Sequence, residues 1–364
     1  MKTRVISLVT NDLSQDQRMN RICTALAENG YNVLLVGRYR KHSIPLREKK
    51  FHQRRIRNFF NTGFLFYAEH NFRLFLLLIR ARFDVVNAND LDTLPAAFLA
   101  AKIKRKKLVY DAHEYFTEQE EVVHRKLVKS VWKWIERTMV PQSDAAYTVS
   151  KGYAELFKKK YHVDFSIVRN VTRLSDRTLD CDRTESYILY QGSVNHGRGL
   201  PQLIEAMKNL QYKLIICGIG DIYEDLKQLA IEYEVDHKVE FRGFVEPEDL
   251  PEITCKAQLG LTIFDKEGLS HYHSLANRFF DYIHAGIPQI AMDYPEYRKF
   301  NAEFEVAQLV ASTSPGDLEK GIRSILEDDL LRSRLRNNAL EARKKYNWQQ
   351  NEKTLLDIYA SLEG

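Results

Sequence analysis

Cysteine is scarce in this sequence and shows no pairing pattern. The four cysteines, Cys23, Cys181, Cys217 and Cys255, lie far apart, and none belongs to a CxxC pair. Zinc ribbons and thioredoxin-like redox sites depend on such pairs, so the spacing argues against both. We therefore expect four reduced thiols that serve as packing residues, as is typical of a reducing compartment.

Long apolar runs are also missing. The most apolar stretch, LFLLLI at 74–79, is bracketed by Arg73 and Arg80 and is far shorter than the roughly 20 residues that a membrane-spanning helix needs. The opening MKTRVISLVTND has only a strand-length apolar run before Asn11 and Asp12, which does not fit a signal peptide. The sequence therefore predicts a cytoplasmic protein without a transmembrane segment.

Proline and glycine are too few for a disordered or fibrous chain, at 9 and 16 of 364 residues. Hydrophobic residues make up 44% and charged residues 28% of the sequence, which is typical of a soluble globular protein. The length is sufficient for two domains of ordinary size, each with its own core.

The sequence does contain a regular alternation of short, β-rich apolar runs with helical patterns. The expected strands are 4–9, 32–37, 84–88, 107–112 and 145–150, then 187–193, 212–220, 238–244, 259–264 and 287–293. A polar stretch between Val171 and Ser186 separates the two sets as a linker. The alternation predicts an α/β protein with two doubly wound parallel sheets, whose ligands bind beyond the carboxyl ends of the strands.

One of these strands runs into a glycine-containing turn, in YQGSVNHGRGLPQLIEAM at 190–207. Gly192, Gly197 and Gly199 let the backbone approach a ligand, and Arg198 adds a cation at the start of a helix. These features indicate an anion site. The alternative, an ordinary βα turn with a solvated arginine, is favoured when this turn is taken alone.

A second candidate site lies in SLANRFFDYIHAG at 274–286, where a short helix is expected to end at glycine. Ser274 or Asn277 could cap this helix, and Arg278 and Asp281 lie three residues apart on one face. A diphosphate could meet Arg278 while Asp281 accepts hydrogen bonds from ribose hydroxyls. The alternative is a salt bridge on the helix surface.

At these motifs the sequence resembles the retaining glycosyltransferases of the GT-B fold, family 4, often called group 1 glycosyltransferases. The likeness is to the bacterial polysaccharide-biosynthesis type, whose second half carries SLPNKLFEYMAAGLPVIA. The matching residues are Ser274, Leu275, Asn277, Arg278, Phe280, Asp281, Tyr282, Ala285, Gly286 and Pro288. The glycine turn and the stretches CGIGDIYEDLKQLA and VEFRGFV are similar to further family motifs in the same order.

The resemblance implies a role for each residue at a matching position. Asp281 stands where the family holds the donor ribose, and Arg198 and Arg278 stand where it neutralises the donor diphosphate. The implied donor-binding set is Gly192, Ser193, Arg198, Gly218, Gly243, Ser274, Leu275, Asn277, Arg278 and Asp281. The first acid of the family's Glu-x7-Glu motif falls on His273, so its contact with the donor sugar passes to His273 or nearby Glu267.

In the first half, VYDAHEYFTE at 109–118 places His113 after a strand, where the family has a histidine beside the donor sugar and the reacting centre. Taken without the family, a histidine there is a packing or capping residue. The resemblance also implies that His113, Arg198 and Arg278 are catalytic, and that Asp111 and Glu114 orient the strand end.

The acceptor side of the site is expected at two turns of the first half. Asn89 and Asp90 follow a strand in VNANDLDTLPAAFLA at 86–100. Asp12, Asp16 and Arg18 lie in TNDLSQDQRMNRI, which replaces the glycine-rich first turn of many relatives. These last three residues fit either an acceptor site or simply the capped start of a helix.

Between Arg38 and Arg57 the sequence has nine basic residues and one acid, Glu48. Together with Phe51, Phe59 and Phe60, these cations predict a surface that lies on anionic lipid, and the alternative is a solvated loop. Nucleic-acid binding is a rival interpretation of the same stretch, but no nucleic-acid motif accompanies it.

The resemblance implies two Rossmann-like domains that face each other across a cleft. The first spans 1–168 and is joined by the carboxyl-terminal helix at 345–364, and the second spans 169–344. The expected function is retaining transfer of a sugar from a nucleotide diphosphate sugar to a saccharide or lipid-linked saccharide, without cofactor or metal. The expected setting is cell-surface polysaccharide synthesis in the cytoplasm or at the inner membrane face. The rivals are a nucleotide-sugar epimerase of the same fold and an inactive relative.

Overall fold

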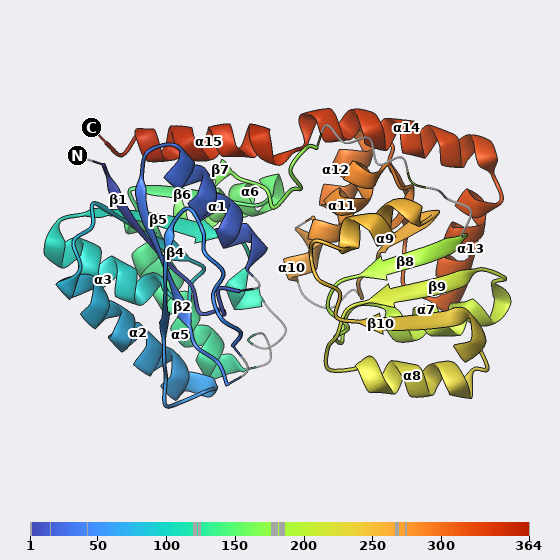
Figure 1. Cartoon of the computed structure of the whole chain (residues 1–364), viewed down its shortest axis with the longest axis horizontal. Coiled ribbons are helices and arrows are strands. Elements are labelled where there is room, and N and C mark those ends of the chain that lie inside the picture. Colours follow the sequence, from blue (N-terminus) through green and yellow to red (C-terminus); the bar gives the residue numbers. More distant parts are fainter. Residues whose placement is uncertain are drawn as a thin grey trace. The chain divides into compact units, whose positions relative to one another are not determined.

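The structure, a computed structural model, describes residues 2–14, 16–41, 43–118, 122, 125–175, 181, 186–265, 269–273 and 275–363. It divides into two compact units. Unit 1 contains the residues up to Asn170 together with those from Asn351 onward, and unit 2 contains Val171 to Gln350. The carboxyl-terminal helix α15 (Trp348–Ala360) therefore enters unit 1 after the preceding helix α14 (Asp329–Lys345) has packed on unit 2 (Figure 1).

Unit 1 is built on a seven-stranded sheet in which every neighbouring pair is parallel. The strand order is β3-β2-β1-β4-β5-β6-β7. The strands are β1 Arg4–Leu8, β2 Asn32–Arg38, β3 His52–Ile56, β4 Val85–Asn89, β5 Lys107–Ala112, β6 Ala145–Thr148 and β7 Ser166–Ile167. The central strands are buried over most of their length because helices cover both faces of a parallel sheet.

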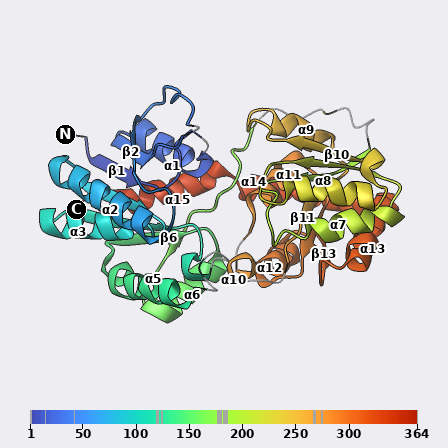
Figure 2. The same ribbon diagram turned by 90° about the horizontal axis from the view of Figure 1, so that it is seen from below.

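The helices of unit 1 cross between these strands. They are α1 Gln17–Glu28, α2 Gly63–Arg80, α3 Leu94–Lys104, α5 Lys126–Met139 and α6 Lys151–Tyr161, with short 3-10 turns at Phe116–Glu118 and Val140–Gln142. The strand order reverses direction after β3, so right-handed crossovers place α2, α3 and α5 on the sheet face opposite α1. Figures 1 and 2 show α2 and α3 side by side.

Unit 2 repeats the plan with a six-stranded parallel sheet in the order β10-β9-β8-β11-β12-β13. Its strands are β8 Tyr187–Gln191, β9 Lys213–Cys217, β10 Val239–Gly243, β11 Leu259–Thr262, β12 Gln289–Met292 and β13 Ala307–Val310. Its helices are α7 Leu200–Ala206, α8 Tyr223–Glu232, α9 Leu250–Lys256, α10 Leu269–Tyr272, α11 Asn277–Ala285, α12 Pro295–Glu303, α13 Pro315–Leu326 and α14, with 3-10 turns at Met207–Asn209 and Asp236–Lys238.

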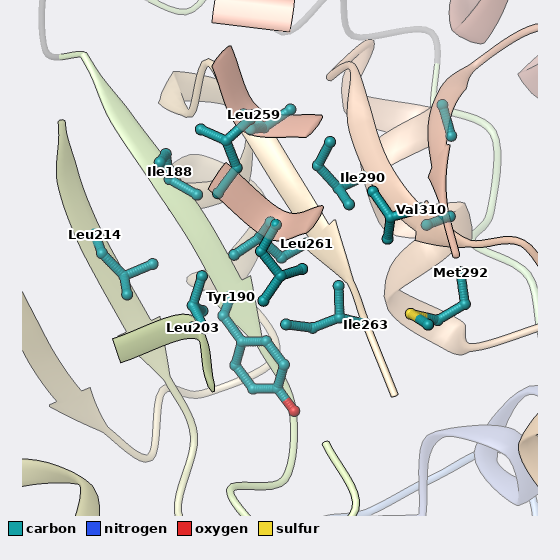
Figure 3. Close-up of a cluster of buried hydrophobic side chains, with 14 of the residues drawn as sticks. Ile188, Tyr190, Leu203, Leu214, Leu259, Leu261, Ile263, Ile290, Met292 and Val310 are labelled. Carbon is teal, nitrogen blue, oxygen red and sulfur yellow. The ribbon is translucent and has the colours of Figure 1, made fainter. Parts of the chain in front are cut away.

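The core of unit 2 forms where side chains of neighbouring strands meet those of the covering helices. Figure 3 shows Ile188, Leu214, Leu261 and Ile290 from four strands in one cluster, and all four are fully buried. Burial of this apolar surface is the main favourable term in folding. Tyr190, from β8, belongs to the same cluster, but its hydroxyl reaches a polar edge where it donates to Ser193 O at 2.8 Å.

Three strands lie outside the apolar runs of the sequence. The edge strand β3 has the sequence HQRRI and passes through the basic stretch, so a solvated loop is the wrong description there. Strands β7 and β13 are short, with two and four residues. Edge strands need little apolar surface because one side of their backbone stays in water, which explains why hydrophobic patterning missed them.

The expectation of four free thiols is wrong for two of them. Cys181 and Cys255 form a disulfide across 74 residues, and it ties the segment before β8 to α9. Cys23 and Cys217 are free and buried. The separation of 74 residues hides this pair from any search for neighbouring cysteines.

The basic stretch is also less exposed than its composition predicts. Arg38 is buried, donates to Asn61 O at 2.8 Å and lies over the Phe66 ring. Arg55 is buried against Asp12, with 2.5 Å between Nη2 and Oδ1. Phe51 is 5% exposed, so the prediction that it lies on lipid is wrong: it belongs to the interior of unit 1.

Candidate functional site

The carboxyl edge of the unit 2 sheet is held together by its own backbone. Gly192 N donates to Cys217 O at 2.9 Å, and Gly218 N donates to Gly243 O at 2.7 Å, so the ends of β8, β9 and β10 are joined. Gly218 has φ +150°, and a Cβ there would collide with Gly192 O. Gly218 thus permits two turns to approach closely, and this packing role is sufficient to require glycine.

The glycine turn after β8 leads into α7 through Gly199, which has φ +64° and no side-chain cap. Asp265, which follows β11, organises this turn. Its Oδ2 accepts from Gly199 N at 3.3 Å, and its Oδ1 accepts from Thr313 Oγ1 at 2.5 Å. Asp265 was not among the expected residues because no motif marks it.

Arg278 lies inside this edge and not on the helix surface, since only 6% of it is exposed. Its guanidinium lies 4.6 Å from the ring centroids of both Tyr190 and Phe264. Nη2 donates to Ile263 O at 3.0 Å, and Nη1 would lie 3.0 Å from a Cβ on Gly192. The absence of a side chain at Gly192 therefore leaves room for this cation.

Arg198 and Arg278 meet at one aromatic ring. The Arg198 guanidinium lies 5.1 Å from the Phe264 centroid, and His271 stacks on the same ring at 4.4 Å. Burial lowers the pKa of His271, and the positive charges of Arg198 and Arg278 lower it further, to about 3. The imidazole is therefore neutral at physiological pH, beside two permanent cations. Sequence reasoning missed His271 and Phe264 because neither falls on a family motif position.

Asp281 is held at the end of the same strand, β8. Its Oδ1 accepts from Thr172 Oγ1 at 2.7 Å, and its Oδ2 accepts from Gln191 Nε2 at 3.0 Å. Gln191 is fixed in turn because its Oε1 accepts from Thr254 Oγ1 at 2.7 Å. Arg278 and Asp281 thus contact adjacent residues, Gly192 and Gln191, at one strand end.

The rest of the expected donor set is placed as follows. Helix α11 begins after Ala276, which makes no side-chain cap, so the expectation that Asn277 caps it is wrong. Leu275 packs against the unit 2 core. Ser274 and Glu267 lie outside the described residues. The predicted end of the helix at Gly286 is confirmed, with φ +65°.

His273 faces a different environment from His271. Its ring meets Tyr272 edge-on at 5.1 Å. Burial lowers its pKa, with opposing contributions from Glu296 and Lys299 of α12. Its electrostatic neighbours are therefore residues of α12, whereas those of His271 are Arg198 and Arg278.

In unit 1, His113 and Asp90 form a close pair at the ends of β5 and β4. His113 Nδ1 lies 2.5 Å from Asp90 Oδ2, and Asp90 Oδ1 accepts from His113 N at 3.1 Å. Asp90 has φ +60°, a conformation that is uncommon outside glycine. Burial would lower the pKa of His113, but the charge and hydrogen bond of Asp90 raise it to about 10. His113 is therefore protonated at neutral pH and stays 25% exposed.

Asp92 is a buried carboxyl group beside this pair that sequence reasoning missed. It accepts from Thr10 Oγ1 at 2.6 Å. Burial raises the pKa of Asp92, and the negative charge of Asp90 raises it further, to about 7. Asn89, expected on the acceptor side, is buried, and its Oδ1 has no hydrogen-bond partner among the residues that the structure describes.

Asp12, Asp16 and Arg18, the three residues expected at the first turn, each contact a different part of unit 1. Asp16 caps α1, accepting from Met19 N at 2.9 Å, as a capped helix start requires. Arg18 is buried and pairs with Asp111 at 2.6 Å. Asp12 accepts from Ser14 N at 3.0 Å as well as from Arg55. These contacts account for each side chain structurally, and they do not bring the three together.

Metal-ligand clusters and membrane-crossing helices are both absent from the described part of the chain. Within it, no three His, Cys, Asp or Glu side chains are grouped as metal ligands would be. Among its helices, none combines the length and the apolar character that crossing a membrane requires.

Both halves of the chain match known families. A family model described as Glycosyl transferases group 1 matches residues 173–342, and one described as Glycosyltransferase Family 4 matches residues 16–173. Residues 173–342 thus belong to the group 1 glycosyltransferases, and residues 16–173 to glycosyltransferase family 4. An uncharacterized glycosyltransferase of Methanocaldococcus jannaschii is 25% identical over 190 residues, which are 50% of this chain and 47% of that protein. The chain thus matches about half the length of this curated relative.

Solved structures establish the GT-B fold. A sucrose-phosphate synthase of Thermosynechococcus elongatus has a TM-score of 0.80 and 16% identity, and the match covers 99% of both chains. The Anabaena protein HepE, solved with UDP and glucose, has a TM-score of 0.77 and 13% identity over 99% of this chain and 100% of that one. A putative UDP-N-acetylglucosamine 2-epimerase of Listeria monocytogenes has a TM-score of 0.65 and 14% identity, and the match covers 98% of this chain and 95% of that one. A synthase and a putative epimerase thus share this fold, so the fold does not decide between these activities.

Proposed function

We propose that this group 1 glycosyltransferase moves a sugar from a nucleotide diphosphate sugar to a saccharide or lipid-linked saccharide, with retention at the anomeric carbon. The observation that carries the proposal is the arrangement at the end of β8. Arg198 and Arg278 converge on Phe264 beside the open Gly192 turn, while Asp281 is held next to Gln191. One strand end thus presents two cations and a carboxylate, which suit the diphosphate and ribose of one nucleotide.

The main chemical task of this site would be to stabilise the nucleoside diphosphate as it leaves the sugar. As the sugar–oxygen bond breaks, negative charge grows on the leaving diphosphate, and cations already in place stabilise it without rearranging. Arg278 is fixed between two aromatic rings, so its position is set before the donor arrives. Arg198 would supply the second charge, and no metal or cofactor is part of the proposal.

Asp281 is a carboxylate that would accept hydrogen bonds from the ribose hydroxyls. A carboxylate offers about four acceptor positions. Thr172 and Gln191 each donate to one of its oxygens and hold the group in place. The same two contacts orient the carboxylate before the nucleotide binds.

Each unit has one histidine that is suited to contact a sugar oxygen, His113 in unit 1 and His271 in unit 2. A protonated His113, held by Asp90, can donate from Nε2 to a sugar oxygen. The neutral His271 beside Arg198 and Arg278 can contact the donor sugar where the family has the first acid of its motif. We assign this contact to His271 in preference to His273, because the neighbours of His273 belong to α12.

The nucleotide-sugar epimerase remains the second candidate, because the Listeria protein named as one shares the fold. The two activities differ in their products. An epimerase converts the donor without an acceptor, whereas a transferase releases nucleoside diphosphate only as the sugar moves. We also propose that the enzyme acts in cell-surface polysaccharide synthesis, because its motifs resemble those of that type of glycosyltransferase.

The test begins with a thermal-shift screen of the full chain against UDP, GDP, ADP and CMP and their sugars, because a ligand that binds the folded state raises its melting temperature. NMR of the donor with and without candidate saccharides then follows the anomeric proton. A new glycoside with the donor's anomeric configuration supports the proposal. Isomerised donor in the absence of acceptor would replace it with the epimerase.

A further inference from the structure

We propose that three arginines at the carboxyl ends of β2 and β3 bind a phosphate group of the acceptor saccharide. They are Arg38, Arg40 and Arg57, and we call them the β2–β3 arginine site. The proposal rests on the sugar-transfer function proposed above and adds a chemical class of acceptor to it. The site lies within unit 1 and shares no residue with the donor-binding edge of unit 2.

Arg38 is a buried cation whose hydrogen bonds are only partly satisfied. It is 8% exposed, and its guanidinium lies 4.0 Å from the centroid of the Phe66 ring. Nη2 donates to both O and Oδ1 of Asn61, at 2.8 and 2.9 Å. Nε is buried and has no hydrogen-bond partner among the residues that the structure describes. A buried donor without an acceptor costs stability, so an acceptor from outside the chain would stabilise this group.

Within the described residues, no carboxylate pairs with the Arg38 guanidinium. Asp12 and Glu69 lie on adjoining elements, but each of them pairs with another arginine. The charge beside Arg38 is instead that of Arg40, and burial together with this like charge lowers the pKa of Arg38. Two cations that lie side by side repel each other, and an anion bound between them relieves the repulsion.

Backbone and ring contacts hold the other two arginines beside Arg38. Tyr39 N donates to Ile56 O at 2.9 Å, so the residues that follow β2 and β3 lie together. The Arg57 guanidinium lies 4.7 Å from the centroid of the Tyr39 ring. Arg40 and Arg57 are exposed, whereas Arg38 is covered. The site thus has one fixed cation and two cations that a ligand can reach from solvent.

The position of the site on the sheet indicates which molecule carries the anion. In the strand order, β2 and β4 flank β1, and β5 follows β4. Neighbouring strands lie about 4.8 Å apart, so the end of β2 is about 10 Å from Asp90 after β4 and about 14 Å from His113 after β5. Ligands of a doubly wound sheet bind along this edge. A saccharide at the proposed reacting centre can therefore extend an anionic group to Arg38.

The number of cations favours phosphate as that group. A phosphate monoester carries about two negative charges and three acceptor oxygens, whereas a carboxylate carries one charge. Arginine is well suited to phosphate because its planar guanidinium presents several donors to the oxygens. Two kinds of acceptor have such a group, a soluble sugar phosphate and a saccharide joined to a lipid through a diphosphate. The site would recognise the phosphate that they share.

Isothermal titration of the full chain tests the site without turnover. The probes are glucose 1-phosphate, farnesyl diphosphate glucose, glucuronic acid and glucose. The nucleoside diphosphate chosen by the thermal-shift screen is present at saturation, so that it fills the proposed donor site and further phosphate binding reports on another site. We expect at least one phosphorylated probe to bind at least about ten-fold more tightly than glucose, because charge-assisted hydrogen bonds are strong. Which of the two phosphorylated probes binds distinguishes a soluble acceptor from a lipid-linked one.

The decisive variant is Arg38→Gln, since glutamine keeps hydrogen-bond donors near Asn61 and removes the charge. It should weaken binding of the phosphorylated probe at least about ten-fold and leave nucleotide affinity unchanged. Arg40→Gln combined with Arg57→Gln alters only exposed positions, so it tests the site even if Arg38→Gln fails to fold, and it should weaken binding about five-fold. The matched control is Arg82→Gln, at an exposed arginine just before β4, on the amino edge of the same sheet. It should bind as the parent does.

Three results would overturn the proposal. In the first, the parent binds glucose as tightly as the phosphorylated probes. In the second, the exposed double variant binds phosphate as the parent does and Arg38→Gln changes only the melting temperature, which would leave Arg38 a purely structural role beside Asn61. In the third, glucuronic acid binds more tightly than either phosphorylated probe, which would make the recognised group a carboxylate.

Failure of this proposal is distinguishable from failure of the proposed function. If nucleotides stabilise the chain but the arginine variants bind every probe as the parent does, only the β2–β3 arginine site is wrong. If no nucleotide stabilises the chain, the sugar-transfer function is wrong. The titration is then run without nucleotide, and the same comparison of Arg38→Gln with Arg82→Gln still decides whether the arginines bind phosphate.

Discussion

Arg278 and Asp281 show how two residues three positions apart serve one strand end. Their side chains leave α11 in different directions, one toward Gly192 and one toward Gln191. The sequence alone showed an arginine and an aspartate three residues apart, and it led to the hypothesis that both bind one nucleotide. Their environment was not evident there, because burial of Arg278 between Tyr190 and Phe264 depends on residues 88 and 14 positions away.

Asp281→Ala should weaken nucleotide binding. Charge-assisted hydrogen bonds to ribose contribute about 1.5–3 kcal/mol, so the expected loss is about one to two decades in Kd. Isothermal titration with the nucleoside diphosphate chosen by the thermal-shift screen measures it. Asp281→Asn is a second variant that removes the charge but keeps one acceptor oxygen, which can serve Thr172 or Gln191 but not both. Unchanged affinity in the alanine variant would remove Asp281 from the nucleotide site.

Arg198→Ala should lower kcat more than it weakens donor binding, because the value of the cation rises as the leaving group gains charge. Arg198 suits this test better than Arg278, which is buried and whose removal would also disturb packing. Steady-state kinetics with the cognate donor separates the two parameters. A rise in KM with kcat unchanged would show that Arg198 only holds the ground state.

Asp92→Asn should stabilise the protein at alkaline pH. Folding raises the pKa of Asp92 from 3.8 to about 7, so ionisation of the buried carboxyl costs stability as the pH rises through that range. Asparagine keeps the size and an acceptor for Thr10 but carries no charge. The melting temperature of the variant should exceed that of the parent at pH 8, and the difference should narrow toward pH 4. A difference independent of pH would mean that Asp92 does not titrate in this range.

At the scale of elements, the strands with apolar runs were predictable and the polar ones were not. Strands such as β9 and β11 are buried over most of their length, so their sequences are largely apolar. In β3, HQRRI has no such run, and only its pairing with β2 defines it as a strand. The pairing of β4 with β5 also places Asn89 opposite Asp111, which brings Asp90 to His113, but strand order does not follow from any single motif.

The ends of β8 and β9 provide a test at the scale of elements. Gly218→Ala should destabilise unit 2 by more than about 2 kcal/mol, because the new Cβ would collide with backbone at Gly192 and φ +150° is strained for alanine. Gly316→Ala is the control, since a Cβ there meets nothing within 4 Å. Chemical denaturation measures both. Equal stability of the two variants would show that the turns separate at little cost.

At the scale of the whole molecule, the family motifs were sufficient to predict a GT-B protein, because the fold follows from two repeated βαβ series. The motifs did not predict which apolar residues are exposed or which cysteines form a disulfide. The exposure of Leu127, Val131 and Trp134 follows only once the opposite side of α5 is known to be buried. Likewise, Cys181 and Cys255 come together only in the folded unit 2, where Cys181 packs against the cluster that contains Cys255.

The disulfide leads to a prediction for the chain as a whole. Closing a loop of 74 residues restricts the unfolded chain, which by the loop-entropy estimate stabilises the folded state by about 4 kcal/mol. Dithiothreitol should therefore lower the melting temperature of the parent. Cys181→Ser should melt at the reduced temperature with or without reductant, whereas Cys217→Ser, at a free buried thiol, should keep the sensitivity to reductant. Mass spectrometry of alkylated protein counts the free thiols independently, and four in the untreated parent would show that the bond does not form in solution. If two are found and reduction still leaves the melting temperature unchanged, the folded state without the bond must gain as much freedom as the unfolded chain.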